Sequence, residues 1–181
     1  FAVSLDAKTA EALANLVPLL CCGEEAAVVG FDRLGQAGGL DPALRGTLRQ
    51  IADDERRHDA ILRGLFAALP ARTLDGAVEH RARHFHLSLP RGGPVLHLAR
   101  IAGLDAAVCT ILSRLLRPGM AIARDDAVFA ALSHIREDET RHVMVSRRFA
   151  LAAADRQAVR NAAAEARGAL AELLALGADA F

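Results

Sequence analysis

The chain has 181 residues, of which 52% are apolar, and its 22 basic and 22 acidic residues give a formal net charge of 0. This length predicts a single domain over residues 1–181 that can bury a core without disulfide or metal cross-links. The charge balance gives no long-range field to attract nucleic acid or an anionic membrane, so we expect neither as a partner.

The cysteines and the apolar runs lead to expectations about the cellular compartment. Cys21, Cys22 and Cys109 form no Cys-x-x-Cys pair, and we expect buried reduced thiols in a cytoplasmic protein. No apolar run approaches about 20 residues, which argues against a membrane-spanning helix. The sequence begins with Phe1 rather than Met, and what precedes it, including any targeting signal, stays open.

Apolar residues at helical spacing predict two helices in the first part of the chain. The first is expected over residues 7–36, with a kink or a break at Pro18. The second is expected from Pro42 to about Leu69, because Asp41 is a good N-cap and proline suits the first helical position.

The later part of the chain predicts three further helices. Residues 71–93 are the least regular segment, and we expect a long crossover there. Its His80, His84 and His86 are more typical of an exposed loop than of a second metal site. The three helices, the last Ala-rich and packed across the others, are expected over 94–116, 125–151 and 155–176. The sequence therefore predicts an all-α four-helix bundle with a long crossover between helices 2 and 3 and an additional C-terminal helix.

A repeated octapeptide carries the strongest chemical signal. Residues 51–58 and 135–142 share the pattern Ile-x-acid-Asp-Glu-x-Arg-His, and each copy places a Glu-x-x-His on the apolar stripe of its helix. Residues three apart lie on one helix face, with about 5–6 Å between their Cβ atoms, so both can reach one metal ion. The two pairs are Glu55 with His58 and Glu139 with His142.

The helices that precede these copies also repeat each other, less strictly. An offset of 81 aligns Glu24 with Asp105 and gives both acids apolar neighbours at inward spacing. An offset of 80 would align Glu25 with Asp105 but would turn Asp32 inward. Glu24 is therefore the preferred ligand and Glu25 the alternative, whereas Asp105 is the only acid in its helix.

Four inward acids and two inward histidines require compensating positive charge. A carboxylate in an apolar core takes up a proton unless a cation balances it, so we predict two bound metal ions. Carboxylate oxygens with one imidazole per metal suit two iron ions, with manganese or a mixed pair as alternatives; zinc and copper stay open on affinity alone. The predicted ligands are Glu24, Glu55, His58, Asp105, Glu139 and His142.

Each Glu-x-x-His is flanked by residues suited to support it, namely Asp54, Arg57, Asp138 and Arg141. A metal-bound histidine usually donates its other ring nitrogen to a carboxylate. We therefore expect a crossed arrangement, in which each aspartate bonds the histidine of the other copy and the arginines neutralise the aspartates. The expected pairs are Asp54 with His142 and Asp138 with His58.

The doubled motif resembles the ferritin-like di-iron carboxylate superfamily. Residues 54–58 and 138–142 are similar to the doubled acid-Glu-x-Arg-His signature of its dioxygen-activating branch, which includes multicomponent monooxygenases and acyl-carrier-protein desaturases and, more loosely, aldehyde-deformylating oxygenases. The resemblance covers roughly residues 19–150. It implies that Glu55 and Glu139 bridge two metals. One metal would be held by Glu24, Glu55 and His58, and the other by Asp105, Glu139 and His142.

The sequence also departs from this family. Asp105 stands where the family usually has a longer Glu, which should open a coordination position. The chain contains no Tyr, which excludes a tyrosyl-radical role, and no Cys-x-x-Cys, which excludes a rubrerythrin with its iron-sulfur domain. It is shorter than the monooxygenases of the branch, which leaves their substrates and their reductase as open questions for this chain.

By resemblance, the expected function is that of a di-iron oxidoreductase. It would activate dioxygen to oxidise a small or acyl substrate, take electrons from a separate reductase and form a homodimer. The alternatives are a ferroxidase that handles iron without an organic substrate, and a metal-binding or degenerate bundle without catalysis. The residues expected to line a substrate pocket are Phe31, Leu62, Leu112 and Val145.

Overall fold

The structure is a computed structural model that describes residues 2–38, 40–72, 75–153 and 155–176. These residues form α-helices, one short 3-10 helix and no strands, so the predicted all-α class is confirmed for them. The elements are α1 (Ala7–Gln36), α2 (Pro42–Phe66), α3 (Gly76–Ser88), α4 (Pro94–Leu115), η1 (Ile122–Arg124), α5 (Asp126–Ala153) and α6 (Arg156–Leu176).

Aspartate side chains begin the first three helices. Asp6, Asp41 and Asp75 each accept a backbone N–H bond from the first turn that follows them. Such caps satisfy donors that a helix leaves without an internal partner. The helix that follows Asp41 ends at Phe66 rather than near Leu69, because the backbone N–H groups of Ala68 and Leu69 bond carbonyls three residues back instead of four.

α1 continues through Pro18, so of the two expectations for this residue the break is wrong and the kink stays a prediction. Proline removes one helical hydrogen bond and crowds the preceding turn. Leu13 and Val17, just before the proline, are buried in a hydrophobic cluster that also contains residues of α2, α4 and α5. These tertiary contacts offset the lost hydrogen bond and hold the helix together.

The segment between α2 and α4 is more ordered than expected, because it contains the 13-residue helix α3. Ala82 and Phe85 are buried on one side of α3 and pack in a cluster with Leu19 of α1 and Leu173 of α6. The many histidines and flanking glycines obscure this short apolar face in the sequence. His80 and His84 are exposed as expected, but the third histidine of the segment is half-buried.

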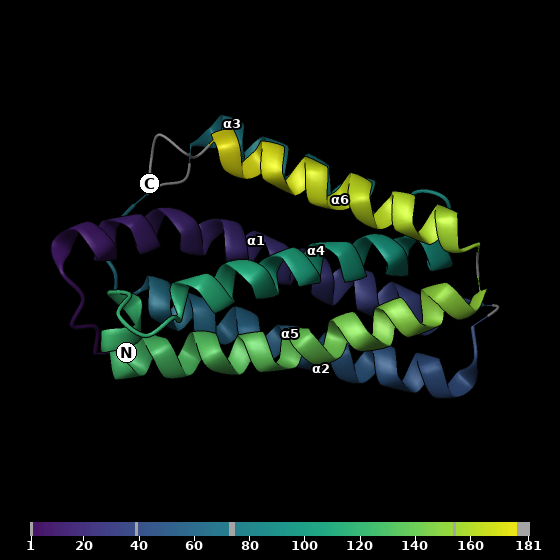
Figure 1. Ribbon diagram of the computed structural model, residues 1–181, viewed down its shortest axis with the longest axis horizontal. Coiled ribbons are helices and arrows are strands. Elements are labelled where there is room, and N and C mark those ends of the chain that lie inside the picture. Colours follow the sequence, from purple (N-terminus) through teal and green to yellow (C-terminus); the bar gives the residue numbers. More distant parts are fainter. Residues whose placement is uncertain (1, 39, 73–74, 154, 177–181) are drawn as a thin grey trace.

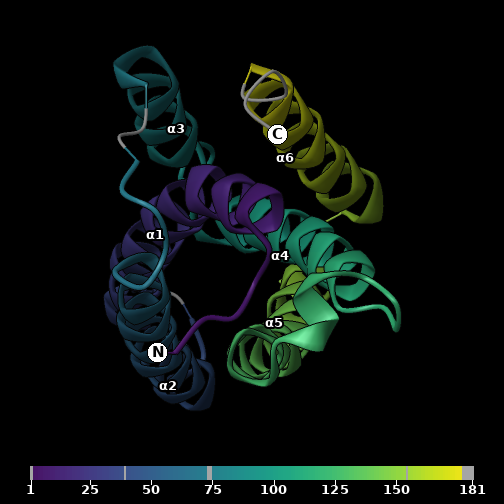
Figure 2. The same ribbon diagram turned by 90° about the vertical axis from the view of Figure 1, so that its left-hand side faces the viewer.

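Figure 1 shows two pairs of antiparallel long helices, α1 with α2 and α4 with α5. The chain between α2 and α4 returns along the length of the molecule, so these two helices run in the same direction. In Figure 2, seen from one end, α3 and α6 form a layer on the α1–α4 side of the bundle. The structure is therefore a helical bundle with a long connection between its two pairs and a further helix after them.

The bundle core has an apolar cluster towards each end. One cluster includes Val17, Leu62, Leu112 and Ile135, and the other includes Phe31, Ile51, Ile101 and Ala150. Along every long helix, the predicted metal ligands lie between residues of these two clusters. The fold therefore places one buried polar layer between two apolar layers.

One apolar residue of α5, at helical spacing from the buried Leu132, faces solvent although that spacing predicts an inward position. Phe129 is 40% exposed, whereas its neighbour Val128 is fully buried. Val128 also donates its backbone N–H to Asp125, which caps the start of α5. The register of the first turn of α5 is therefore one residue away from that predicted.

α6 packs very closely on α4 at one glycine. A Cβ atom built on Gly103 would lie 2.5 Å from the backbone oxygen of Ala163, closer than real Cβ contacts. Only glycine allows the two helices to approach this closely. Gly103 therefore fixes α6 against the bundle.

Two remaining expectations concern the membrane and the thiols. Among the described residues, α1 and α4 are long and apolar enough to cross a bilayer. That is weak support for a membrane span, because helices in the core of a bundle pass the same test, and both helices carry inward carboxylates. The thiols of Cys21, Cys22 and Cys109 are free but half-buried rather than buried.

Candidate metal centre

Four long helices contribute the buried polar layer. α2 and α5 supply their Glu-x-x-His pairs from the middle of the apolar stripe, and α1 and α4 supply one acid each. None of these six residues is more than 8% exposed. The six residues are Glu24 of α1, Glu55 and His58 of α2, Asp105 of α4, and Glu139 and His142 of α5.

Four of these six residues converge on one point. Ligand atoms of Glu24, Glu55, His58 and Glu139 all lie within 4.8 Å of one another. Nδ1 of His58 is 3.2 Å from Glu55 Oε2 and 3.5 Å from both Glu24 Oε2 and Glu139 Oε1. A carboxylate–histidine group that could hold a metal ion is therefore present in the core.

The other two residues lie next to this group and are less fully engaged. Nδ1 of His142 is 3.1 Å from Glu55 Oε1 and 3.8 Å from Glu139 Oε1, yet it makes no hydrogen bond of acceptable geometry. Oδ2 of Asp105 is also buried without a hydrogen-bond partner. Buried polar atoms without partners are costly, so these two atoms are suited to a ligand.

The opposite ring nitrogen of each histidine is held by an aspartate. Nε2 of His58 lies 3.2 Å from Asp138 Oδ2, and Nε2 of His142 lies 3.1 Å from Asp54 Oδ2. This is the crossed arrangement expected from the repeat. Because each aspartate accepts the Nε2 proton, a ring that becomes neutral keeps its proton on Nε2 and turns the lone pair of Nδ1 towards the carboxylates.

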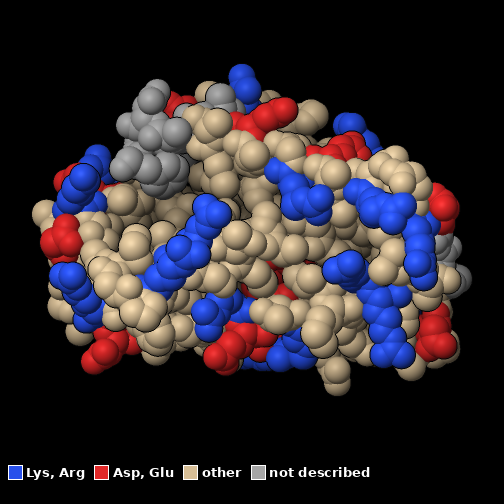
Figure 3. All heavy atoms as spheres, in the orientation of Figure 1, with Lys and Arg blue, Asp and Glu red and all other residues tan. Residues whose placement is uncertain are grey.

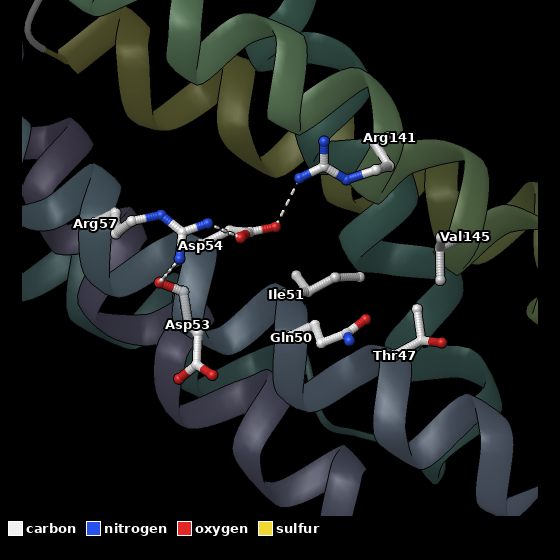
Figure 4. Close-up of a pocket in the computed structure, with 8 residues that line it drawn as sticks. All are labelled: Thr47, Gln50, Ile51, Asp53, Asp54, Arg57, Arg141 and Val145. Carbon is white, nitrogen blue, oxygen red and sulfur yellow. Dashed lines mark hydrogen bonds and ion pairs between the residues drawn. The ribbon is translucent and has the colours of Figure 1, made fainter.

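The arginines support the two aspartates unequally. Arg141 Nη2 lies 2.7 Å from Asp54 Oδ2 and 2.9 Å from Asp138 Oδ1, and so bridges both. Of these two aspartates, Arg57 bonds Asp54 alone, and Figure 4 shows Asp54 between the two guanidinium groups. Asp138 has instead the exposed His134, whose Nε2 is 3.8 Å away at the rim of the site. Asp54 is therefore the more strongly bound aspartate.

The alternative ligand on α1 is excluded by its position. Glu25 points to the surface, where it pairs with Arg63, while Glu24 is 8% exposed and faces His58. Asp53, paired with Arg56, and Asp59, paired with Arg63, also make surface ion pairs on α2. Figure 3 shows acidic and basic side chains interspersed over the face drawn there.

Burial and mutual contacts move the pKa values of the cluster in opposite directions. Burial raises the pKa of Glu24 and of Asp105 well above their usual range. Burial acts the same way on Glu55, but contacts with the two histidines outweigh it and lower its pKa to about 2. Burial disfavours charged imidazoles, yet the surrounding glutamates raise the pKa of His58 to about 12 and of His142 to about 10.

These pKa shifts indicate that, without metal, protons on the acids and histidines compensate the buried negative charge. Metal ions that bound there would displace these protons and provide the same compensation. The donors are carboxylate oxygens and imidazole nitrogens, which suit iron or manganese. The residues present therefore fit a carboxylate-bound metal, and the number and identity of the ions stay predictions.

A narrow apolar cavity of about 90 Å³ reaches the cluster from the side of α1 and α4. Its wall includes Glu24, Glu55, Asp105 and Glu139, and the rest is mainly apolar. The apolar residues come from α1, α4 and α6: Leu16, Leu19, Leu20, Leu104, Val108, Ile111, Leu112, Leu170, Leu173 and Leu174.

Only one of the residues expected to line a pocket does so here. Leu112 lines this cavity, whereas Phe31 and Leu62 are fully buried in the two core clusters. Val145 lines a different pocket, above Asp54 on the α2–α5 side. The expectation was wrong for these three because an inward position can pack against the core without facing the metal cluster.

Two histidines near the site were missed from the sequence. His86 of α3 lines the apolar cavity, and His97 of α4 is buried at 6% exposure beside Gly30. His97 lies eight residues before Asp105, two helical steps of four along the same stripe, which could have indicated its inward position. Nothing local indicates His86, because its position depends on how α3 packs on α1.

Comparison with known proteins does not assign a family to the chain. Protein-family models, curated proteins and solved structures give no match to the chain. The function must therefore be argued from the site itself.

Proposed function

We propose that this chain is a ferritin-like di-iron carboxylate oxidoreductase that activates dioxygen to oxidise a small or acyl substrate. One observation carries the proposal: a polar layer of four carboxylates and two histidines is buried between two apolar clusters. Buried charge of this kind is unfavourable unless cations compensate it. A bundle core built from Glu-x-x-His pairs and single acids on facing helices is the ligand arrangement of di-metal carboxylate proteins.

The proposed ligands divide between two iron ions, with manganese or a mixed pair as alternatives. Glu24, Glu55 and His58 hold one ion, and Asp105, Glu139 and His142 hold the other. Glu55 supports the bridging role because its two oxygens face different histidines, Oε2 towards His58 and Oε1 towards His142. When bound, the ions supply the redox chemistry with dioxygen.

The surrounding residues have separate tasks in this proposal. Asp54 and Asp138 keep the proton of each histidine on Nε2, which leaves Nδ1 free to coordinate. Arg141 holds both aspartates in the charged state. The apolar cavity excludes water from one side of the cluster and gives an organic substrate a route to it.

The cavity favours an oxygenase or oxidase over iron handling. Iron ions are hydrated and charged, so an entry path for iron should be polar, whereas the wall of this cavity is mainly leucine. Electrons would come from a separate reductase, and we propose a homodimer. Size-exclusion chromatography tests the assembly: a dimer agrees with the enzyme, and a large cage would instead favour iron storage.

Two adjacent glutamates allow a matched test of the metal centre. The chain would be titrated with Fe(II) without oxygen, and bound iron would be measured by elemental analysis. We expect two irons per chain, a loss of more than about tenfold in affinity for Glu24→Gln, and no change for Glu25→Gln. Equal behaviour of the two variants, or no bound iron in the unmodified chain, would contradict the proposal.

Substrate oxidation needs a second measurement. The iron-loaded chain with a chemical reductant should consume dioxygen faster when a medium-chain aldehyde or acyl compound is present. Oxygen consumption that depends only on added Fe(II), with ferric iron as the product, would show a ferroxidase instead.

A further inference from the structure

A second and larger cleft adjoins the apolar cavity. It has a volume of about 440 Å³ and lies between α1, α3 and α4. The cleft and the cavity share the residues Gly23, Ala27, His86, Leu104 and Asp105. The two spaces therefore adjoin each other along these residues, and the cleft alone is within the size range of small-molecule sites.

The two spaces differ in chemistry. The cavity wall is mainly leucine, whereas the cleft also carries Arg33, Arg83 and the acid Glu25. Glu25 is already paired with Arg63, outside the cleft. Arg33 is exposed and has no ion-pair partner among the residues that the structure describes. The cleft therefore presents uncompensated positive charge at its outer end.

Two neutral imidazoles line the cleft, and that of His86 also lines the cavity. Burial lowers the pKa of His86 and of His97 to about 4, so both are uncharged at neutral pH. Neither ring has a hydrogen-bond partner in the described part of the chain. Each can therefore donate or accept a hydrogen bond without adding charge to the passage.

Gly23 and His86 form the junction of the two spaces. A Cβ atom on Gly23 would lie 3.8 Å from Cε1 of His86, in ordinary contact. A larger side chain at this position of α1 would fill the space in front of the imidazole. The passage therefore depends on a residue without a side chain.

We propose that the cleft and the cavity together bind one amphipathic anion, with its acidic group at Arg33 and its alkyl chain past Gly23 and His86 towards the metal cluster. The ligand class is a medium-chain carboxylate. Arg33 and Glu24 are nine residues apart on α1, about 13 Å along the helix axis, which a short acid could not span. This inference deepens the proposed function and rests on it for the role of the bound chain as substrate or substrate analogue.

Calorimetric titration tests the ligand class on the unmodified chain, below the micellar concentration of each probe. Decanoate should bind with one molecule per chain. Butyrate should bind more than about tenfold more weakly because its chain leaves the cavity empty. Decyltrimethylammonium, with the same chain and opposite charge, should also bind more weakly. Equal affinities for decanoate and the cationic probe would overturn the assignment of the acidic group.

Two variants test the route, each with a matched control. Gly23→Leu should weaken decanoate binding by more than about tenfold, whereas Gly46→Leu, at a position with open space in α2, should not. Arg33→Gln should weaken it about fivefold, as loss of a partly exposed ion pair predicts, whereas the exposed Arg114→Gln should not. Unchanged binding in both Gly23→Leu and Arg33→Gln would refute the site.

The orientation of the ligand has its own readout. In chain loaded with Mn(II), the terminal methyl signal of decanoate should broaden more than the signal next to the carboxylate. The reverse order would contradict the proposed orientation. If the chain binds iron but not decanoate, this inference is refuted and the proposed function stands. If the chain binds decanoate but takes up no metal under any condition, the proposed function is refuted and the ligand site stands.

Discussion

The two sides of the metal cluster are built differently. On the α2–α5 side, charged residues contact each other closely, with Asp54 bonded by His142 and by two arginines. On the α1–α4 side, the cluster members are the two buried acids Glu24 and Asp105, and an apolar cavity begins beside them. The first side fixes the histidines and their protons, and the second leaves room for a ligand.

This difference follows from where the helices meet. α1 packs mainly on α2, and α4 packs mainly on α5. On the α1–α4 side, α3 and α6 lie over the bundle in Figure 2, and residues of α6 with His86 of α3 complete the wall of the cavity. The covering helices pack on the bundle through a small apolar cluster that they share with Leu19 of α1.

The largest expected effect comes from displacing one covering helix. Gly103→Val would place carbon atoms against the backbone of Ala163, which cannot move without α6. We expect a loss of about 3 kcal/mol in the free energy of unfolding and a fall of about 6–12 °C in melting temperature. Gly168→Val, at an open position of α6, is the control. A melting temperature within a degree of the unmodified chain would mean that α6 does not hold the α1–α4 side closed.

The polar side predicts the next largest effect. Asp54→Asn should lower metal affinity about 10–100-fold, because it removes the negative charge and one of the two oxygens that accept from His142 and from the two arginines. Asp138→Asn should cost less, because only Arg141 among the arginines bonds it. Competition with a chelator measures both, and Asp53→Asn on the exposed face of α2 is the control. A larger effect for Asp138 would reverse the asymmetry described here.

The sequence predicted the polar side better than the apolar side. The crossed Asp–His pairs could be inferred because both members belong to one repeated octapeptide, whose spacing fixes their positions on α2 and α5. The cavity could not, because its wall combines α1, α4 and α6 with His86 of a helix that was not expected. Local spacing specifies which face of a helix is buried, but it does not specify which buried residues are left without neighbours.

The buried His97 of α4 should make the stability of the chain depend on pH. Burial, with smaller contributions from Arg100 and Arg33, lowers the pKa of His97 to about 4, while its value in the unfolded chain is about 6.5. The unfolded chain therefore binds a proton first as the pH falls, and stability is lost from about pH 6.5 down to pH 4. Between pH 7 and pH 5 this amounts to about 2 kcal/mol.

Replacing the histidine tests this assignment. In His97→Leu, metal-free chain should lose about 2 kcal/mol less stability than the unmodified chain over the same interval, measured by denaturant unfolding at each pH. His84→Leu, in which the exposed imidazole of α3 is replaced, is the control. Identical pH dependence in all three proteins would show that His97 is not buried in the neutral form.

The smallest effect is expected where α1 meets α2 at the surface. Glu25 and Arg63 form an ion pair whose side chains are 58% and 55% exposed. Such pairs contribute about 0–1 kcal/mol, so Glu25→Gln should change the free energy of unfolding by less than about 0.5 kcal/mol. The adjacent Glu24→Gln acts in the buried layer, where the pKa of Glu24 is raised by burial and a neutral amide is tolerated. Glu24→Gln should therefore leave the stability of the metal-free chain about unchanged but reduce the stabilisation by added iron. Glu25→Gln should retain that stabilisation in full. Thermal unfolding with and without Fe(II) distinguishes the two variants.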